Sequence, residues 1–204
     1  MLFEDRIEAG KKLANLIPKL DNPLILAIPR GGVEIGKIMS RALGIPMDIC
    51  IARKLGAPGN PELAIGAVTS QGSVFLDQEM ISGLGVDENY LLDVITRERE
   101  EAVRREKTFR SRPLSISGKD LIIVDDGIAT GATIKAIIEQ VKNQAKSITL
   151  AVPVIPKEII PDLKSRVNNI IYISAPDKFY AVGQYYRDFP QLTDEDIIRL
   201  LGES

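Results

Sequence analysis

The sequence predicts an α/β fold with a mostly parallel sheet flanked by helices. Short, wholly apolar runs such as PLILAI (23–28) and DLIIV (120–124) are typical of buried parallel strands. Segments with helical periodicity follow both runs, at residues 33–45 and 132–144. Because strands and helices alternate along the chain, we expect a parallel sheet with helices on its two faces.

The same patterns predict the other elements of the first half. Apolar residues between Ile7 and Leu20 have helical spacing, and MDICIA (47–52) is expected to be a second strand. The Gly, Pro and Asn content of residues 56–63 predicts a loop. Two apolar runs on either side of residues 70–72 predict a hairpin with a glycine-containing turn.

In the second half we expect a long charged helix at 87–109, strands at 147–155 and 168–176, and a helix at 193–201. The last helix begins with a capping signature, in which Thr193 is followed by acidic residues. The length of 204 residues fits a single domain that covers residues 1–204.

Composition excludes several classes of function. A net charge of −2 does not indicate bulk attraction to nucleic acid or anionic membranes, so an anion site must be built locally. The single cysteine, Cys50, excludes an internal disulfide. The absence of histidine leaves carboxylates, Lys, Arg, backbone amides or a substrate-borne metal for catalysis. No apolar run approaches the roughly 20 residues that span a bilayer and the N-terminus is unlike a secretory signal, so we expect a cytoplasmic protein.

Two adjacent acids follow the apolar strand in LIIVDDGIATGAT (121–133). Asp125 and Asp126 would lie at the carboxyl end of the sheet, where open α/β sheets bind ligands. Two neighbouring carboxylates need hydroxyl groups or a cation to offset their repulsion, and the vicinal hydroxyls of a ribose suit them. The alternative for the pair alone is an exposed strand end.

The five residues at 129–133, which follow Gly127 and Ile128, predict a phosphate-binding loop. Ala129, Thr130, Gly131, Ala132 and Thr133 lead into a helix whose first backbone N–H groups and dipole favour an anion. Gly131 permits close backbone approach. The alternative is an ordinary helix N-cap. Ribose hydroxyls followed by a phosphate describe a ribose 5-phosphate.

The whole thirteen-residue pattern resembles the signature with which type I phosphoribosyltransferases bind phosphoribosyl pyrophosphate (PRPP). The resemblance covers nearly the whole chain and is nearest to a subgroup of predicted phosphoribosyltransferases without an assigned substrate. It implies a Rossmann-like parallel sheet, with a mobile loop and hairpin insertion at about 55–110 and a small hood, whose C-terminal part is at about 176–204. It also implies transfer of 5-phosphoribosyl from PRPP to a nitrogenous base or amine, with release of pyrophosphate, in nucleotide salvage.

The resemblance assigns cationic groups to the pyrophosphate. Pro29, Arg30, Gly31 and Gly32 fall where the family has its pyrophosphate-binding loop, which often contains a non-proline cis peptide. The glycines would let backbone amides face an anion, although a plain strand-to-helix turn is the alternative. Arg53 and Lys54 fall at the start of the mobile catalytic loop, and a solvated pair is the alternative. Mg²⁺ is expected mainly through PRPP oxygens, with Asp125 and Asp126 as possible ligands.

The acceptor stays open. Enzymes that act on 6-oxopurines usually have an aspartate where this chain has Ala129, so such an acceptor is disfavoured. The candidate contacts to the acceptor base are Ile128 in the turn and four aromatic residues of the hood, Phe179, Tyr180, Tyr185 and Tyr186. Their aromatic faces can stack on a base. The alternative is that the tyrosines pack in the core or in a dimer. We expect a homodimer.

A second class of function is also open. Some proteins of this fold bind PRPP or nucleotides as effectors and contact nucleic acid, for which the charged residues 96–112 are the candidate surface. The glutamates interleaved there favour a solvated helix instead, so we do not expect nucleic-acid binding.

Overall fold

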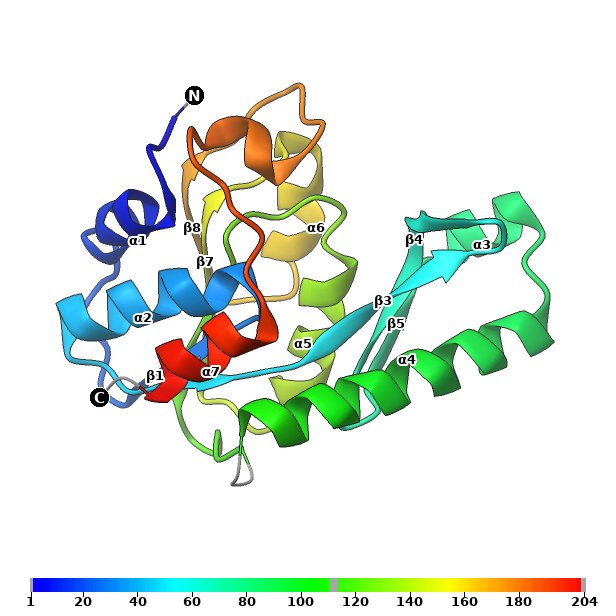
Figure 1. Cartoon of the computed structure of the whole chain (residues 1–204), viewed down its shortest axis with the longest axis horizontal. Helices are drawn as coiled ribbons and strands as arrows, with labels where there is room; N and C mark the ends of the chain where they lie inside the picture. The colour runs from blue at the N-terminus through cyan, green and yellow to red at the C-terminus, as the bar shows by residue number, and fades with distance from the viewer. Residues whose placement is uncertain (1, 111–113, 203–204) are drawn as a thin grey trace. The chain divides into compact units, whose positions relative to one another are not determined.

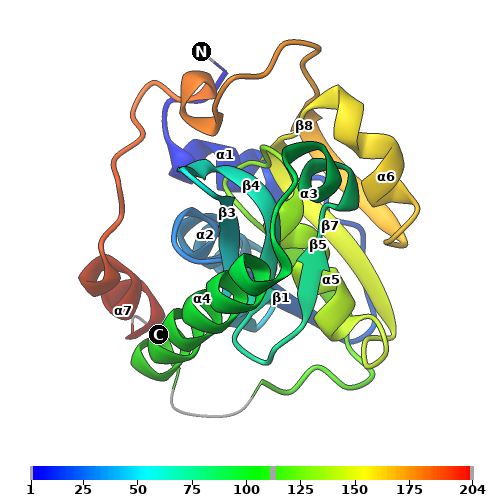
Figure 2. The same ribbon diagram turned by 90° about the vertical axis from the view of Figure 1, so that its right-hand side faces the viewer.

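The computed structural model describes residues 2–110 and 114–202, which form two compact units (Figures 1 and 2). The first unit combines Met1–Ile49, Arg112–Ala129 and Gln144–Ser204. The second combines Cys50–Ser111 and Thr130–Asn143. The chain therefore passes from one unit to the other within the predicted phosphate-binding loop.

A five-stranded parallel sheet forms the centre of the first unit, in the order β2-β1-β6-β7-β8. Its strands are β1 (Pro23–Ala27), β2 (Met47–Ile49), β6 (Asp120–Val124), β7 (Ser147–Val154) and β8 (Asn169–Ser174). Ala27, Val124 and Ala151 are in register across β1, β6 and β7. The loops that leave these strands therefore start at one edge of the sheet.

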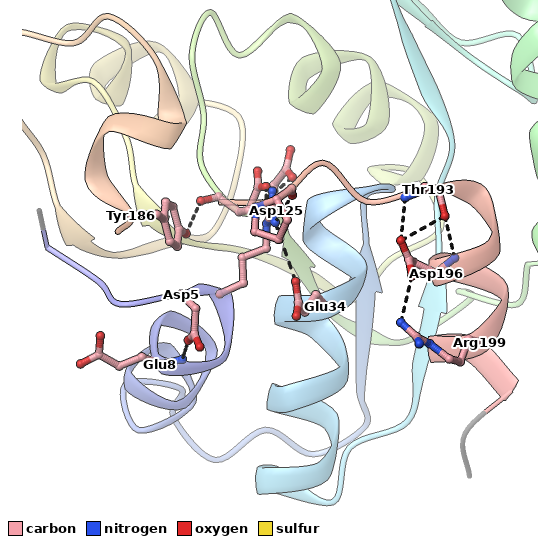
Figure 3. Close-up of polar contacts among 11 residues, drawn as sticks. Asp5, Glu8, Glu34, Asp125, Tyr186, Thr193, Asp196 and Arg199 are labelled. Atoms are coloured by element: carbon pink, nitrogen blue, oxygen red, sulfur yellow. Dashed lines mark hydrogen bonds and ion pairs between the residues drawn. The ribbon is translucent and has the colours of Figure 1, made fainter. Parts of the chain in front are cut away.

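Helices α1 (Arg6–Ala14) and α2 (Gly31–Leu43) pack against each other and on this sheet, and α7 (Asp194–Gly202) packs on α2 (Figure 1). The short helices η1 (Lys157–Ile159), α6 (Ile160–Lys164) and η2 (Val182–Tyr185) follow β7 and β8. The Asp5 carboxylate caps α1 by accepting a hydrogen bond from Glu8 N–H. The capping signature of α7 is confirmed, because Thr193 and Asp196 exchange side-chain to backbone hydrogen bonds (Figure 3).

The first and last segments of the first unit lie side by side. Phe3 and Tyr186 form a parallel bridge, and Arg187 N–H and Asp188 N–H donate to the carbonyls of Phe3 and Glu4. The rings of Phe3 and Tyr186 are in contact, with centroids 5.2 Å apart. Both side chains are buried in the core between α1, α2 and the sheet.

The second unit contains an antiparallel sheet of β3 (Ala52–Ala57), β4 (Asn60–Thr69) and β5 (Val74–Leu76). Leu55, Ile65 and Val68 pack with residues of α3 (Gln78–Leu84) and α4 (Glu88–Phe109). Ala64 and Ala67 pack with α5 (Ala132–Val141). This sheet therefore has two separate apolar clusters.

The predicted α/β class, the parallel sheet, the hairpin around residues 70–72 and the long charged helix are confirmed. The single strand at 47–52 is wrong, because the chain leaves the first sheet after Ile49 and enters the second at Ala52. The loop at 56–63 is also wrong, because β3 and β4 continue to a tight turn at residues 58 and 59. In the described part of the chain, no helix is long and apolar enough to cross a membrane.

Candidate active site

Asp125 and Asp126 directly follow β6 at the loop-bearing edge of the first unit's sheet. Both are partly buried. Asp125 Oδ1 accepts a hydrogen bond from Asp126 N–H at 2.8 Å, and Tyr186 Oη donates to the Asp126 carbonyl at 2.6 Å (Figure 3). The pair of acids is therefore held by its own backbone and by a core tyrosine.

Arg6, at the start of α1, is the counter-ion of Asp126. Its Nε lies 2.9 Å from Asp126 Oδ2, and its Nη1 donates to the Pro190 carbonyl at 2.9 Å. The guanidinium also covers the Phe189 ring, 3.8 Å from the centroid, and lies 3.8 Å from Glu34 Oε2. With a side chain only 5% exposed, Arg6 connects both ends of the chain to the acid pair.

Burial opposes the negative charge of these acids. Loss of solvent contact raises the pKa of Asp125 well above its ordinary value, and the neighbouring Asp126 charge raises it further. Burial also raises the pKa of Asp126, although the Arg6 charge opposes that change. The pKa of Glu34 is raised for the same reason, again against the influence of Arg6. The site thus holds more carboxyl groups than one arginine can neutralise, and it suits a ligand that brings hydroxyl donors or a cation.

The predicted pyrophosphate loop touches the acid pair. A Cβ atom at Gly31 would lie 1.8 Å from Asp126 Oδ2, and one at Gly32 would lie 2.6 Å from the Val124 carbonyl oxygen. The peptide between Pro29 and Arg30 is cis, as the resemblance implied. Arg30 is half-buried just before α2, and among the described residues it has no carboxylate partner. Only glycine at 31 and 32 allows the start of α2 to approach this closely.

The predicted phosphate loop begins α5. Gly131 has φ 75°, a left-handed conformation that favours glycine, and precedes the first helical residue, Ala132. Thr130 is exposed, and its Oγ1 accepts a long hydrogen bond of 3.5 Å from Ala132 N–H. Thr133 lies in the first turn of the helix and is half-buried. The helix therefore begins without a hydrogen bond from an N-cap side chain. Binding of a phosphate by its first amides stays a prediction.

Arg53 and Lys54 lie in β3 and have acidic neighbours. Arg53 donates through Nε and Nη2 to Glu98 of α4, at 2.9 and 2.7 Å. Lys54 Nζ lies 3.0 Å from Glu62 Oε2, with Glu62 92% exposed. Arg53 is thus held between two elements, whereas Lys54 is in a surface pair of the kind that contributes little stability.

Comparisons with known proteins identify the family. The model described as "Phosphoribosyl transferase domain" matches residues 6–189. The chain belongs to the phosphoribosyl transferase domain family. The match begins at Arg6, ends at Phe189 and includes both acids and both glycine loops.

Relatives of this family member are similar over its whole length. A Mycobacterium tuberculosis (strain CDC 1551 / Oshkosh) protein named "Putative phosphoribosyl transferase MT0597" is 35% identical over 208 residues, which is 100% of this chain and 47% of that protein. The chain therefore spans about half the length of the curated relatives that it matches. The crystal structure of TT1426 from Thermus thermophilus has a TM-score of 0.80, with 40% identity and coverage of 98% of both chains. The purine phosphoribosyltransferase of Pyrococcus horikoshii Ot3 has a TM-score of 0.50 at 17% identity, covering 94% of this chain and 99% of that one, which shows the shared fold.

The aromatic residues of the predicted hood differ in their surroundings. Tyr186 is a core residue, with its ring between Phe3 and Phe189, and burial raises its pKa. Tyr185 stacks on Phe179, with centroids 5.4 Å apart. Tyr180 is 85% exposed. Tyr186 therefore packs in the core, which was the alternative to base stacking, and the ring of Tyr180 is exposed to solvent.

Ile128, the other predicted base contact, is only 3% exposed. Its N–H donates to the Val154 carbonyl at 3.0 Å, so the turn after the acids is joined to the end of β7. A Cβ atom at the preceding Gly127 would lie 2.6 Å from Val182 Cγ1. Contact between Ile128 and a base stays a prediction.

Four residues around the acids were not predicted from the sequence: Arg6, Glu34, Phe189 and Pro190. A signal for Arg6 was present in the sequence, because Arg6 shares a helical spacing with Ala9, Gly10, Leu13 and Ala14, which are the positions that α1 buries. An arginine on the apolar stripe of an amphipathic helix requires a buried anionic partner. The partner itself, 120 positions further along the chain, has no signature in the sequence.

A family member is expected to use Mg²⁺ with PRPP, and its donor set can be tested for fit. No group of three or more His, Cys, Asp or Glu residues in the two described stretches is arranged to hold a metal ion. Asp125 and Asp126 alone provide two carboxylates, each with one oxygen already in a hydrogen bond. This set fits a Mg²⁺ that keeps its waters and substrate oxygens and takes at most one or two protein ligands.

Proposed function

We propose that the chain transfers 5-phosphoribosyl from PRPP to a nitrogenous acceptor and releases pyrophosphate. The observation that carries this proposal is the contact between the Gly31 backbone and the Asp126 carboxylate. A loop suited to a diphosphate and a pair of acids suited to a ribose thereby meet at one edge of the first unit's sheet. The phosphate loop follows Asp126 in the sequence after Gly127 and Ile128, in the order expected for a ribose 5-phosphate.

The site residues bind and orient PRPP, and none of them forms a covalent bond with it. Asp125 and Asp126 accept hydrogen bonds from the ribose hydroxyls, and residues 129–133 hold the 5-phosphate. The diphosphate is bound by the positive charges of Arg30 and Lys54 and by the backbone amides of Gly31 and Gly32. Arg53 joins β3 to α4 through Glu98. As the C1′–O bond to pyrophosphate breaks, the acceptor nitrogen forms its bond to C1′ and then passes its proton to solvent.

Mg²⁺ bound with PRPP, to which Asp125 and Asp126 could add a ligand, would offset the negative charge that develops on the leaving pyrophosphate. Closure of residues 55–110 to exclude water belongs to the same proposal. The proposal also includes a role in nucleotide salvage, a cytoplasmic location and assembly into a homodimer.

The acceptor is proposed to be a base or amine other than a 6-oxopurine, because Ala129 stands where such enzymes usually have an aspartate. The exposed ring of Tyr180, with the stacked pair of Phe179 and Tyr185, supplies aromatic surface for such an acceptor.

The test is pyrophosphate release from PRPP and Mg²⁺ against a panel of bases and amines. Asp125→Asn and Asp126→Asn should each lower turnover by about tenfold or more, since a charge-assisted hydrogen bond contributes about 1.5–3 kcal/mol. Asp21→Asn is the control, because Asp21 is exposed, its partner among the described residues is Lys146, and it is far from either acid in the sequence. Wild-type turnover in both acid variants would contradict the proposal.

Binding of PRPP without turnover of any acceptor would instead indicate the alternative function, a PRPP-sensing regulator. The candidate nucleic-acid surface of such a regulator carries internal ion pairs, since Arg104 and Arg105 both bind Glu101. These pairs lower the pKa of Glu101 to about 2 and leave less free positive charge for phosphates.

A further inference from the structure

We infer that Arg6 is a positioning residue for Asp126. Its hydrogen bond to Oδ2 fixes the orientation of the carboxylate, so that Oδ1 faces the substrate. This inference rests on the proposed function, because it assigns Asp126 to PRPP. It adds a residue outside the acid pair and outside both glycine loops.

The first support is the immobilisation of the Arg6 guanidinium. Nε binds Asp126 Oδ2, Nη1 binds the Pro190 carbonyl, and the flat face of the group lies on the Phe189 ring. Glu34 contributes charge at a longer distance, 3.8 Å. A lysine has neither the flat face nor the fixed fork of donors, so these contacts select arginine.

The second support is the state of the four carboxylate oxygens. Asp125 Oδ1 accepts the Asp126 N–H, and Asp126 Oδ2 accepts from Arg6. One oxygen of each acid is thereby engaged within the protein, and the two carboxyl groups also interact with each other through their side chains. Their remaining lone pairs are the acceptors that two neighbouring hydroxyl groups of a ligand can use. Gly31 restricts the same Oδ2 from another side, because a Cβ atom there would lie 1.8 Å from it.

The competing explanation is that Arg6 merely joins the two ends of the chain. The molecule offers a control for that role, because Arg187 Nη1 also joins these ends, 3.2 Å from Glu4 Oε2. Arg187 is 70% exposed, and no contact with either acid is recorded for it in the described chain. A variant at Arg187 therefore loses a link between the same segments and keeps the Asp126 contact.

A double-mutant cycle on PRPP affinity tests the inference. Arg6→Gln should weaken PRPP with Mg²⁺ by about tenfold, which corresponds to about 1.4 kcal/mol. In an Asp126→Asn background the same change should weaken PRPP less than about twofold, because the group through which Arg6 acts is already altered. Arg187→Gln should stay within about twofold of wild type.

Equal losses from Arg6→Gln in both backgrounds would overturn the inference, as would wild-type affinity in the single variant. Should Arg6→Gln fail to fold by circular dichroism, Arg6→Lys takes its place in the cycle. It keeps the charge but loses the contacts with the Pro190 carbonyl and the Phe189 ring, so a smaller loss of PRPP affinity with the same non-additivity is expected. A wild-type protein that bound no PRPP would overturn the proposed function and this inference together, whereas additive losses with intact binding would overturn this inference alone.

Discussion

Burial in the folded protein disfavours the negative charge of the Asp125 side chain. Between its ordinary pKa of 3.8 and its raised folded value, the folded state binds more protons at Asp125 than the unfolded state does. Stability must therefore fall as pH rises through that interval. Asp126 and Glu34 act in the same direction, because burial raises the pKa of each.

Asp125→Asn should consequently stabilise the ligand-free protein at pH 8 while it impairs turnover. Each pKa unit by which the folded value exceeds the unfolded one corresponds to about 1.36 kcal/mol, and 1 kcal/mol shifts the melting temperature by about 2–4 °C in a chain of this size. Melting curves of variant and wild type at pH 4 and pH 8 measure the effect. The gain should be present at pH 8 and absent near pH 4; a variant less stable than wild type at pH 8 contradicts the argument.

Gly31→Ala should weaken PRPP binding strongly, because the new methyl group collides with Asp126 Oδ2. Displacing that oxygen also breaks its contact with Arg6, so we expect a loss of about tenfold or more in affinity. Gly83→Ala is the matched control, since a Cβ atom there meets no atom within 4 Å. Titration calorimetry with PRPP and Mg²⁺ distinguishes the two variants, and equal affinities would show that the loop tolerates the displacement.

At the level of single residues, local patterns predicted the acids and both glycine loops because the relevant neighbours are adjacent in sequence. The partners of Asp126 could not be predicted in this way. Arg6 and Tyr186 reach it from 120 and 60 positions away, through contacts that only the folded chain creates.

At the level of elements, strand β3 carries two consecutive basic residues, Arg53 and Lys54, which have different acidic partners. Lys54 is paired with a highly exposed glutamate, so it can leave that partner at little cost. Arg53 is bound to Glu98, whose side chain is only 14% exposed. We therefore expect Lys54 to serve the ligand and Arg53 to serve the fold.

Lys54→Ala should weaken PRPP and pyrophosphate much more than ribose 5-phosphate, which lacks the diphosphate, with little change in melting temperature. Its effect on turnover should exceed its effect on affinity, because the contact strengthens as charge develops on the leaving group. Arg53→Ala should instead lower the melting temperature. Affinities for the three ligands provide the comparison, and an equal loss for ribose 5-phosphate would remove Lys54 from the diphosphate.

The two wrong element predictions have physical reasons. Cys50 and Ile51 are buried between β2 and β3, so no polar residue marks the point where the chain leaves the first sheet. The Gly and Pro content of residues 56–63 reflects a register shift in the hairpin, where a Cβ atom at Gly56 would lie 2.7 Å from Pro61 Cα. Helix α3 was not predicted from the sequence, because it is short and its local signals were the Asp77 and Gly85 caps.

At the level of the whole molecule, PRPP with Mg²⁺ should stabilise the folded chain. A ligand at 100 times its dissociation constant adds about 2.7 kcal/mol to the free energy of unfolding. Thermal unfolding with and without millimolar PRPP and Mg²⁺ checks this, with ribose 5-phosphate as a weaker comparison ligand. An unchanged melting temperature would contradict PRPP as the ligand.

The pairing of the chain's first and last segments also determines when the site can exist during biosynthesis. A nascent chain that has reached residue 186 already contains both acids and Arg6, but it lacks Phe189 and Pro190, which hold the guanidinium in place. Contacts separated by 184 positions form late, because the intervening chain must first be ordered. Ribosome-bound chains should therefore be able to pair the last strand of the sheet, which ends at Ser174, before they acquire affinity for PRPP.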